Sequence, residues 1–317
     1  MAYSAGDAIL DDEYNVFVGS TSDPFGYNHF AGPGSGEYGL NQSTISTVSA
    51  GDAIAASQWN ALFTGIVNIG NHTNDSITSV SVSAGDAVAI ASALVADLAS
   101  LAAEVAAGST SATAFDTTAV GSSTNSGTFN GTSTIERSVT FANNNTMRAF
   151  FNAGGKIRVD PSCVTGIDGS KDTVFNDLTT TAIGNLDIAA HASTRSGSGE
   201  TLTTNGLGNG FHDLGTGYTN IIKLTSDNSG YTSNTVQIEA KLNAAVGSAT
   251  VMTVKMTSTD AAADTTFTAG NLSSVPTNPN EAPRMTLALI EVSPNDTQGL
   301  AADIKTASNA EVSNSTS

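Results

Sequence analysis

The stretch TVQIEAKLN, residues 235–243, alternates apolar and polar side chains from one position to the next. In an extended chain, such alternation places all the apolar groups on one side and the polar groups on the other. The apolar positions are Val236, Ile238, Ala240 and Leu242. A two-residue period with one polar side predicts a strand of an antiparallel sheet that faces a core on one side and water on the other.

The same period recurs in other parts of the second half of the chain. Clear examples are VMTVKMT at 251–257 and KIRVD at 156–160, and RSVTFA, TNIIKLT and MTLALIEV add further strand candidates. Turn-forming clusters of Gly, Asn and Ser separate these runs. We therefore predict a mainly β protein whose residues 135–317 form an antiparallel β-sandwich, similar to a jelly roll.

Composition restricts the class of partner. The chain has 317 residues, of which 13% are charged, and a net charge of −18. Residues 1–136 contain thirteen acidic groups and no Lys or Arg, since Arg137 is the first basic residue apart from histidine. Nucleic-acid binding is disfavoured because phosphate contacts need Lys and Arg. We interpret the acidity as solubility in salty surroundings rather than as a docking surface for a basic partner.

Cysteine use and apolar runs restrict the setting. Cys163 is the single cysteine, so an intrachain disulfide or a cysteine-based metal cluster is impossible. The N-terminal residues lack the basic and apolar regions of a signal peptide. The apolar run 87–107 contains Asp97 near its middle, and a central Asp costs about 2.5–3.5 kcal/mol on membrane insertion. We expect a water-soluble helix there, no membrane insertion and no cofactor.

A short motif occurs three times before residue 90, as SAGDAI at 4–9 and 49–54 and as SAGDAV at 83–88. Gly accepts a positive φ and Asp bonds its following backbone, so each copy predicts a turn, followed by a short strand and the start of a helix. We interpret the aspartates as turn residues and expect no metal site, because no EF-hand pattern is present. The sequence alone leaves Ca²⁺ binding open. The residues concerned are Gly6, Asp7, Gly51, Asp52, Gly85 and Asp86.

The second copy leads into a predicted helix that begins with Ser57 as its N-cap and stops at Gly70-Asn71. Its apolar residues recur at helical spacing from Trp59 onward, and Tyr14 occupies the equivalent position after the first copy. The sequence thus predicts small α+β turn-strand-helix repeats over residues 1–86, which we interpret as a docking region. Residues 108–134, rich in Ser, Thr and Gly, are predicted to be a linker between this half and the sandwich, or a loosely ordered pair of strands.

The segment 87–107 has apolar residues at alternating steps of four and three, which is a heptad seam. Two interpretations are equally supported. The helix either forms a self-associating bundle, with a trimer favoured, or packs on its own domain. The seam residues are Ala87, Ala91, Leu94, Leu98, Leu101 and Val105.

Two stretches carry a resemblance to a known family. They are YGLNQSTISTVSAGDAIAASQWNALFTGIVNIGNHTND, from Tyr38 onward, and VTFANNNTMRAFFNAGGKIRV, from Val139 onward. Both resemble virion structural proteins of marine tailed bacteriophages, especially cyanophages. In the second stretch the matching residues are Phe150, Phe151, Asn152, Gly154, Gly155, Ile157 and Arg158. From the residues themselves, we expect Phe150 and Phe151 to be core and Gly154-Gly155 to form a hairpin turn.

The resemblance implies a non-enzymatic structural protein of a phage virion, most directly a tail-associated fibre or appendage subunit. A capsid decoration or head-fibre protein is the first alternative. A glycan- or receptor-binding sandwich is the second, with Phe211, His212 and Tyr218 as candidate contacts in a Gly-rich loop. An enzyme ranks last, because none of the four histidines lies in a zinc or nucleophile motif. We therefore expect no catalytic residues.

The same interpretation sets expectations for location and partners. Such a protein would be made in the host cytoplasm without a signal peptide and released in the virion on lysis. Its partners would be other virion proteins, further copies of itself and a host-surface glycan.

Overall fold

The computed structural model describes residues 11–19, 26–32, 39–40, 42–73, 75–77, 83, 91–108, 110, 115–164, 170–262, 283–294 and 308–317. The chain divides into two compact units. Unit 1 comprises Met1–Asp116, Ala142–Gly155 and Ser293–Lys305, and unit 2 comprises Thr117–Phe141, Lys156–Val292 and Thr306–Ser317. The predicted division into four successive segments is therefore wrong, because the chain passes between the two units several times.

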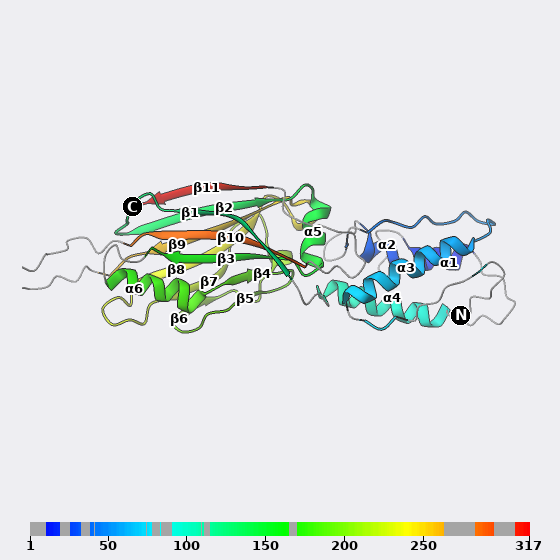
Figure 1. Cartoon of the computed structure of the whole chain (residues 1–317), viewed down its shortest axis with the longest axis horizontal. Helices are drawn as coiled ribbons and strands as arrows, with labels where there is room; N and C mark the ends of the chain where they lie inside the picture. Colours follow the sequence, from blue (N-terminus) through cyan, green and yellow to red (C-terminus); the bar gives the residue numbers. More distant parts are fainter. Residues whose placement is uncertain are drawn as a thin grey trace, which may run out of the picture. The chain divides into compact units, whose positions relative to one another are not determined.

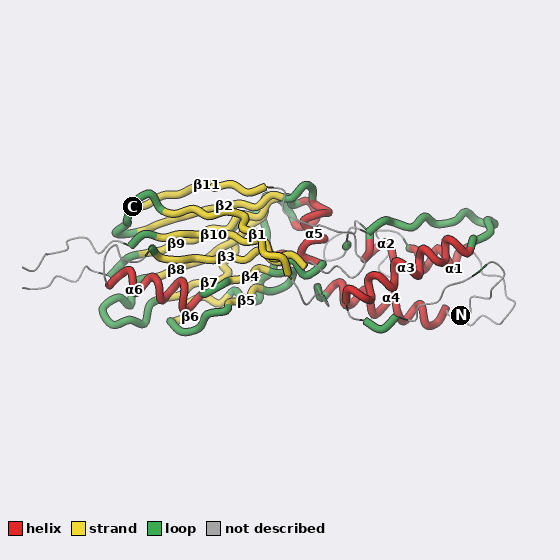
Figure 2. Tube along the Cα trace, in the orientation of Figure 1, coloured by secondary structure: helices red, strands yellow, loops and turns green. Residues whose placement is uncertain are grey.

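Unit 2 is a β-sandwich of two antiparallel sheets, drawn as yellow strands in Figure 2. The five-stranded sheet has the order β1 (Phe115–Thr124), β10 (Met285–Pro294), β3 (Lys156–Cys163), β4 (Leu186–Ile188) and β5 (Ser193–Arg195). The six-stranded sheet has the order β11 (Ser308–Thr316), β2 (Thr132–Thr140), β9 (Val251–Thr259), β8 (Thr235–Leu242), β7 (Thr219–Thr225) and β6 (Thr201–Asn205). The predicted fold class is confirmed.

The alternation in the sequence produces the buried side of each sheet. In β8, Val236, Ile238 and Ala240 are fully buried, and the residues between them are partly exposed. The register pairs Ile238 with Met256 of β9, so apolar residues of neighbouring strands lie on the same face. Burial of such side chains stabilises the fold by about 1.5–3 kcal/mol each.

A helical segment packs against strands of both sheets. Helix α6 (Ser170–Asn176) continues into the π-helix η1 (Asp177–Ile183), which contacts β3 of the five-stranded sheet and β7 and β8 of the six-stranded sheet. Figure 1 labels α6 in green on the sandwich. The hydroxyl of Thr179 donates to the carbonyl oxygen of Phe175 at 2.6 Å. Gly184, with φ of +60°, ends the segment. The described residues of unit 2 also contain two single-turn helices, namely η2 (Phe211–Asp213) and η3 (Val246–Ser248).

Of the two predictions for residues 108–134, the linker is wrong and the strand pair agrees with the structure, because the segment contains β1 and the beginning of β2. Polar contacts hold this region in the sandwich. The guanidinium of Arg137 on β2 donates to Ser123 Oγ of β1 at 2.6 Å and to Asn309 Oδ1 of β11 at 2.8 Å. The Thr and Ser residues of β1 are compatible with a β-strand. Their polar side chains have hydrogen-bond partners on other strands, and composition alone does not reveal such partners.

The secondary structure described in unit 1 is mainly helical. Its helices are α1 (Asp11–Val18), α2 (Tyr27–Ala31), α3 (Ala56–Thr73), α4 (Ala91–Ala106) and α5 (Asn144–Asn152). The Trp59 ring lies at the centre of an aromatic cluster, with its centroid 5.1 Å from that of Tyr14, 6.0 Å from Phe17 and 5.7 Å from Phe63. The predicted core positions Tyr14 and Trp59 are thus both buried in one core.

Helix α3 differs from its predicted bounds, and no strand precedes it over residues 53–55. It begins at Ala56 and continues to Thr73. The side-chain oxygen of Gln58 accepts a hydrogen bond from the backbone N–H of Ala55 at 2.7 Å, which is one half of a capping box. Ser57 is therefore inside the first turn rather than at the N-cap.

Candidate functional site

The stretch that begins at Tyr38 and the stretch that begins at Val139 meet in unit 1. The side-chain amide of Asn152, at the end of α5, donates to the backbone carbonyl oxygen of Gly39 at 3.1 Å. Gly39 belongs to the first stretch and Asn152 to the second. Residues 38–75 and 142–155 therefore belong to one folded unit, although they are far apart in the sequence.

Helix α5 is capped at both ends by its own sequence. The side chain of Asn143 accepts a hydrogen bond from the backbone N–H of Thr146 at 2.9 Å, as an N-cap does. At the other end, the N–H of Gly155 donates to Phe150 O at 2.8 Å, and the N–H of Gly154 donates to Phe151 O at 2.9 Å. These two bonds, with Gly154 at a φ of +88°, form a Schellman motif.

The predicted hairpin turn at Gly154-Gly155 is therefore wrong, because the preceding residues are helical and the glycines end that helix. The prediction that Phe150 and Phe151 belong to the core is confirmed, since both are buried and their ring centroids lie 5.1 Å apart.

Two asparagine side chains bind the extended segment between α2 and α3. Asn15 on α1 donates to the carbonyl oxygen of Val48 and accepts from its N–H, both at 2.9 Å. Asn28 on α2 makes the same pair of bonds with Ile45, both at 2.8 Å. Each amide thus satisfies a backbone donor and acceptor as a neighbouring strand would. Sequence reasoning did not identify Asn15 or Asn28 as contacts of this segment.

The second copy of the repeated motif forms the predicted turn. The N–H of Asp52 donates to Ser49 O at 3.0 Å, and Gly51 has a φ of +85°. The side chain of Asp52 is exposed, which fits a turn residue. The other two copies, with Gly6, Asp7, Gly85 and Asp86, lie outside the described residues.

The heptad seam packs inside unit 1. Leu94, Leu98 and Leu101 of α4 are buried in the same core as Trp59. Of the two interpretations of this helix, the structure supports packing on its own domain. The seam leucines pack against other residues of the same chain, so they do not form the exposed apolar stripe that a coiled-coil trimer would need.

The three candidate receptor contacts in unit 2 are not brought together on an open surface. Phe211 is fully buried, so its ring is not accessible to a ligand, contrary to the expectation. The ring of His212 stacks on His191, with centroids 4.9 Å apart and an interplanar angle of 21°.

Tyr218 lies beside cationic side chains of the six-stranded sheet. The ammonium nitrogen of Lys255 is 3.9 Å from the ring centroid, and that of Lys241 is 4.3 Å from it. These are cation–π distances. Burial raises the pKa of the Tyr218 hydroxyl above its ordinary value, and the carboxylate of Glu136 adds to this increase. Lys255 also pairs with Glu239, at 2.7 Å between Nζ and Oε2.

One further buried titratable group lies in unit 1. His72 near the end of α3 is fully buried, and burial lowers the pKa of its imidazole to about 4. Within the part of the chain that the structure describes, neither ring nitrogen has a hydrogen-bond partner. The imidazole is therefore neutral at pH 7 and behaves as a core side chain.

Metal and membrane sites are not found among the described ranges. Within them, no group of three or more His, Cys, Asp or Glu side chains is placed to hold a metal ion. In the same residues, none of the helices has the length and apolar character needed to span a bilayer. Comparison with protein-family models, with curated proteins and with solved structures gives no match.

Proposed function

We propose that this chain is a non-enzymatic structural protein of a tailed-phage virion, in which unit 1 attaches to the particle and unit 2 is a displayed β-sandwich. The observation that carries the proposal is the hydrogen bond from Asn152 to Gly39. It joins the first of the two stretches that resemble virion structural proteins to the part of the second, residues 142–155, that belongs to the same unit. A tail-associated fibre or appendage is the leading position.

The chemistry of the matching residues supports a structural role. Trp59, Phe150 and Phe151 are core side chains, whereas Gly154 and Gly155 are helix-capping residues. What the resemblance shares is thus a set of packing and capping positions. Shared residues that only build a fold indicate a protein that acts through its shape and its surface. Assembly into a particle is a role of this kind.

The proposal is tested by immunogold electron microscopy with antibodies raised against the full chain. The specimens are intact particles of the phage that encodes it. Gold on the tail supports the leading position, and gold on the capsid supports the alternative of a decoration or head-fibre protein. Particles that bind no antibody, and contain no peptide of this chain after dissociation, contradict the proposal.

One observation favours recognition of a host-surface glycan as a second function of unit 2. Lys241 and Lys255 both lie against the ring of Tyr218, in a chain with only eleven Lys and Arg residues. Ammonium groups beside an aromatic ring suit an acidic polysaccharide better than a neutral one. Loss of binding to an acidic host polysaccharide in Lys241→Gln, with Lys223→Gln on β7 as the control, would support it. If Lys241→Gln binds the polysaccharide as well as the control Lys223→Gln does, the second function is contradicted.

A further inference from the structure

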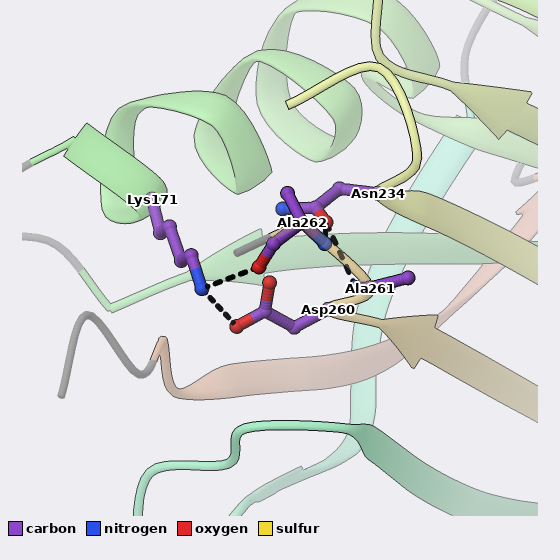
Figure 3. A network of polar contacts seen from close by, with 5 residues as sticks. All are labelled: Lys171, Asn234, Asp260, Ala261 and Ala262. Carbon is purple, nitrogen blue, oxygen red and sulfur yellow. Dashed lines mark hydrogen bonds and ion pairs between the residues drawn. The ribbon is translucent and has the colours of Figure 1, made fainter. Parts of the chain in front are cut away.

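An amine and a carboxylate are buried together in unit 2 (Figure 3). Lys171, near the start of α6, places its Nζ 2.9 Å from Oδ2 of Asp260, which follows β9. Both side chains have no exposed surface. Nζ also donates to the backbone carbonyl oxygen of Ala262 at 3.1 Å. The two reactive groups are therefore in contact and shielded from water.

The backbone around Asp260 is held in place by its own hydrogen bonds. The N–H of Asp260 donates to Gly131 O at 2.7 Å. The side-chain oxygen of Asn234 accepts from the N–H groups of Ala261 and Ala262, at 2.9 and 2.8 Å. Figure 3 shows Asn234 and the segment 260–262 side by side, with Lys171 approaching from α6. A reactant pair that is fixed at contact distance avoids most of the entropic cost of reaching a reactive geometry.

Burial also favours the reactive protonation state. Two opposite charges in a water-free interior lose their hydration, and this loss offsets much of their mutual attraction. Transfer of one proton from the ammonium to the carboxylate leaves a neutral amine and a neutral carboxylic acid, which cost less to bury. These neutral forms are the reactants for an amide bond.

We propose that Lys171 and Asp260 condense to form an intramolecular isopeptide bond. Asp260 first takes a proton from the ammonium group. The lone pair of Nζ then attacks Cγ, and a C–N bond forms. A second proton passes from nitrogen to the departing oxygen, the C–O bond breaks, and one water molecule leaves. The reaction needs no oxidant or other co-reactant. The remaining N–H of the amide continues to donate to Ala262 O.

The cross-link would join positions that are 89 residues apart in the chain. A covalent bond that closes a long loop limits the unfolded chain more than one that closes a short loop. Cys163 is the only cysteine, so an intrachain disulfide cannot serve this purpose. The isopeptide bond would take the place of a disulfide in the sandwich, whether or not the chain belongs to a virion.

The test is the intact mass of the purified full chain, measured after denaturation. The proposal predicts a mass that is lower than the sequence mass by one water molecule. The sequence mass itself would overturn it. Asp168-Gly169 can also lose water by forming a succinimide, which mild alkali hydrolyses. A missing water that returns after alkaline treatment would therefore overturn the proposal as well.

A tryptic digest of the wild-type chain locates the bond independently of any variant. Trypsin does not cleave after an amide-linked lysine, so the expected product is peptide 159–195 joined to peptide 256–284. Separate peptides 159–171 and 172–195 would contradict the proposal. The partly exposed pair Lys255–Glu239, at 2.7 Å, is the internal control and should remain unlinked. Lys171→Arg keeps the positive charge and should give the sequence mass, and a missing water in that variant would count against the assignment.

Discussion

The side-chain amide of Asn152 donates to the backbone carbonyl oxygen of Gly39 at 3.1 Å, although 113 positions separate them in the chain. Between them, the chain builds β1 and β2 of unit 2 and then returns. Asn152 has no exposed surface. The early part of unit 1 around Gly39 therefore gains this hydrogen bond only when the later segment that carries Asn152 folds onto it.

The first prediction concerns that amide. Asn152→Asp keeps the shape of the side chain but replaces a donor with a carboxylate, which cannot donate to Gly39 O. A buried group left without its partner costs about 1–3 kcal/mol, and more when it is charged. We expect a fall of at least this size in the free energy of unfolding, measured in urea. Asn71→Asp on the exposed side of α3 is the control and should change it by less than about 0.5 kcal/mol. Equal stability of the two variants would show that the contact is dispensable.

The second prediction concerns the end of α5. Gly154 has a φ of +88°, and an added Cβ would lie 2.5 Å from Cγ2 of Thr110. Gly51 has nearly the same φ, +85°, with nothing within 4 Å of its added Cβ. Gly51→Ala should therefore lower the free energy of unfolding by the conformational cost alone, about 1–2 kcal/mol. Gly154→Ala should lose more than this, because the steric clash adds to the conformational cost.

Thermal unfolding of the two glycine variants separates these costs. The double variant Gly154→Ala/Thr110→Ser removes the clashing methyl group and should recover part of the loss. If the two single variants melt at the same temperature, steric contact at Gly154 contributes nothing.

The third prediction concerns pH. Burial lowers the pKa of His72 to about 4, below its ordinary value of 6.5. Between these values the unfolded chain binds a proton that the folded chain does not, so folding is weakened as the pH falls. The contribution of His72 is fully present above pH 6.5 and declines toward pH 4, by about 3 kcal/mol in total.

His72→Leu removes this proton-linked term. Urea unfolding at several pH values between 4 and 7 should show a smaller decline for the variant than for the wild type. Carboxylates titrate in the lower part of the range in both proteins, so the difference between the two curves reports His72. Parallel curves would mean that the imidazole is protonated equally in the folded and unfolded states.

The fourth prediction separates packing from oligomerisation in α4. Leu98 is buried in the core of unit 1. Leu98→Ala should lower the free energy of unfolding by about 2–5 kcal/mol, as core truncations do. Light scattering under native conditions should give the same oligomeric mass as the wild type. A change from trimer to monomer with little loss of stability would instead support the self-associating bundle. Val95→Ala, at an exposed position of the same helix, is the matched control.

The β-sandwich was predictable because its signal is local and repeated. Each alternating run, such as that around Ile238, specifies its own buried face without reference to distant residues. The aromatic core of unit 1 was also predictable, since Trp59 begins an apolar stripe of helical spacing. The turn at Gly51 followed from the Gly-Asp dipeptide, because Gly accepts a positive φ and Asp bonds its following backbone.

The remaining features depend on distant partners. Residues 115–124 form a strand although they are polar, because β1 has a place next to β10 and near Arg137 that composition does not reveal. The glycines after Phe151 cap a helix, whereas the same pair could equally end a hairpin. The asparagines that bind the segment 45–48 have no distinctive sequence signal, since their partners are backbone atoms.

The most direct test of the central claim is quantitative peptide mass spectrometry of purified phage particles, banded in a density gradient and washed free of lysate. The claim predicts peptides from both units, in a constant ratio to a major capsid protein and in several copies per particle. Full recovery of the chain in the particle-free fraction, with none in the band, would contradict a structural role in the virion.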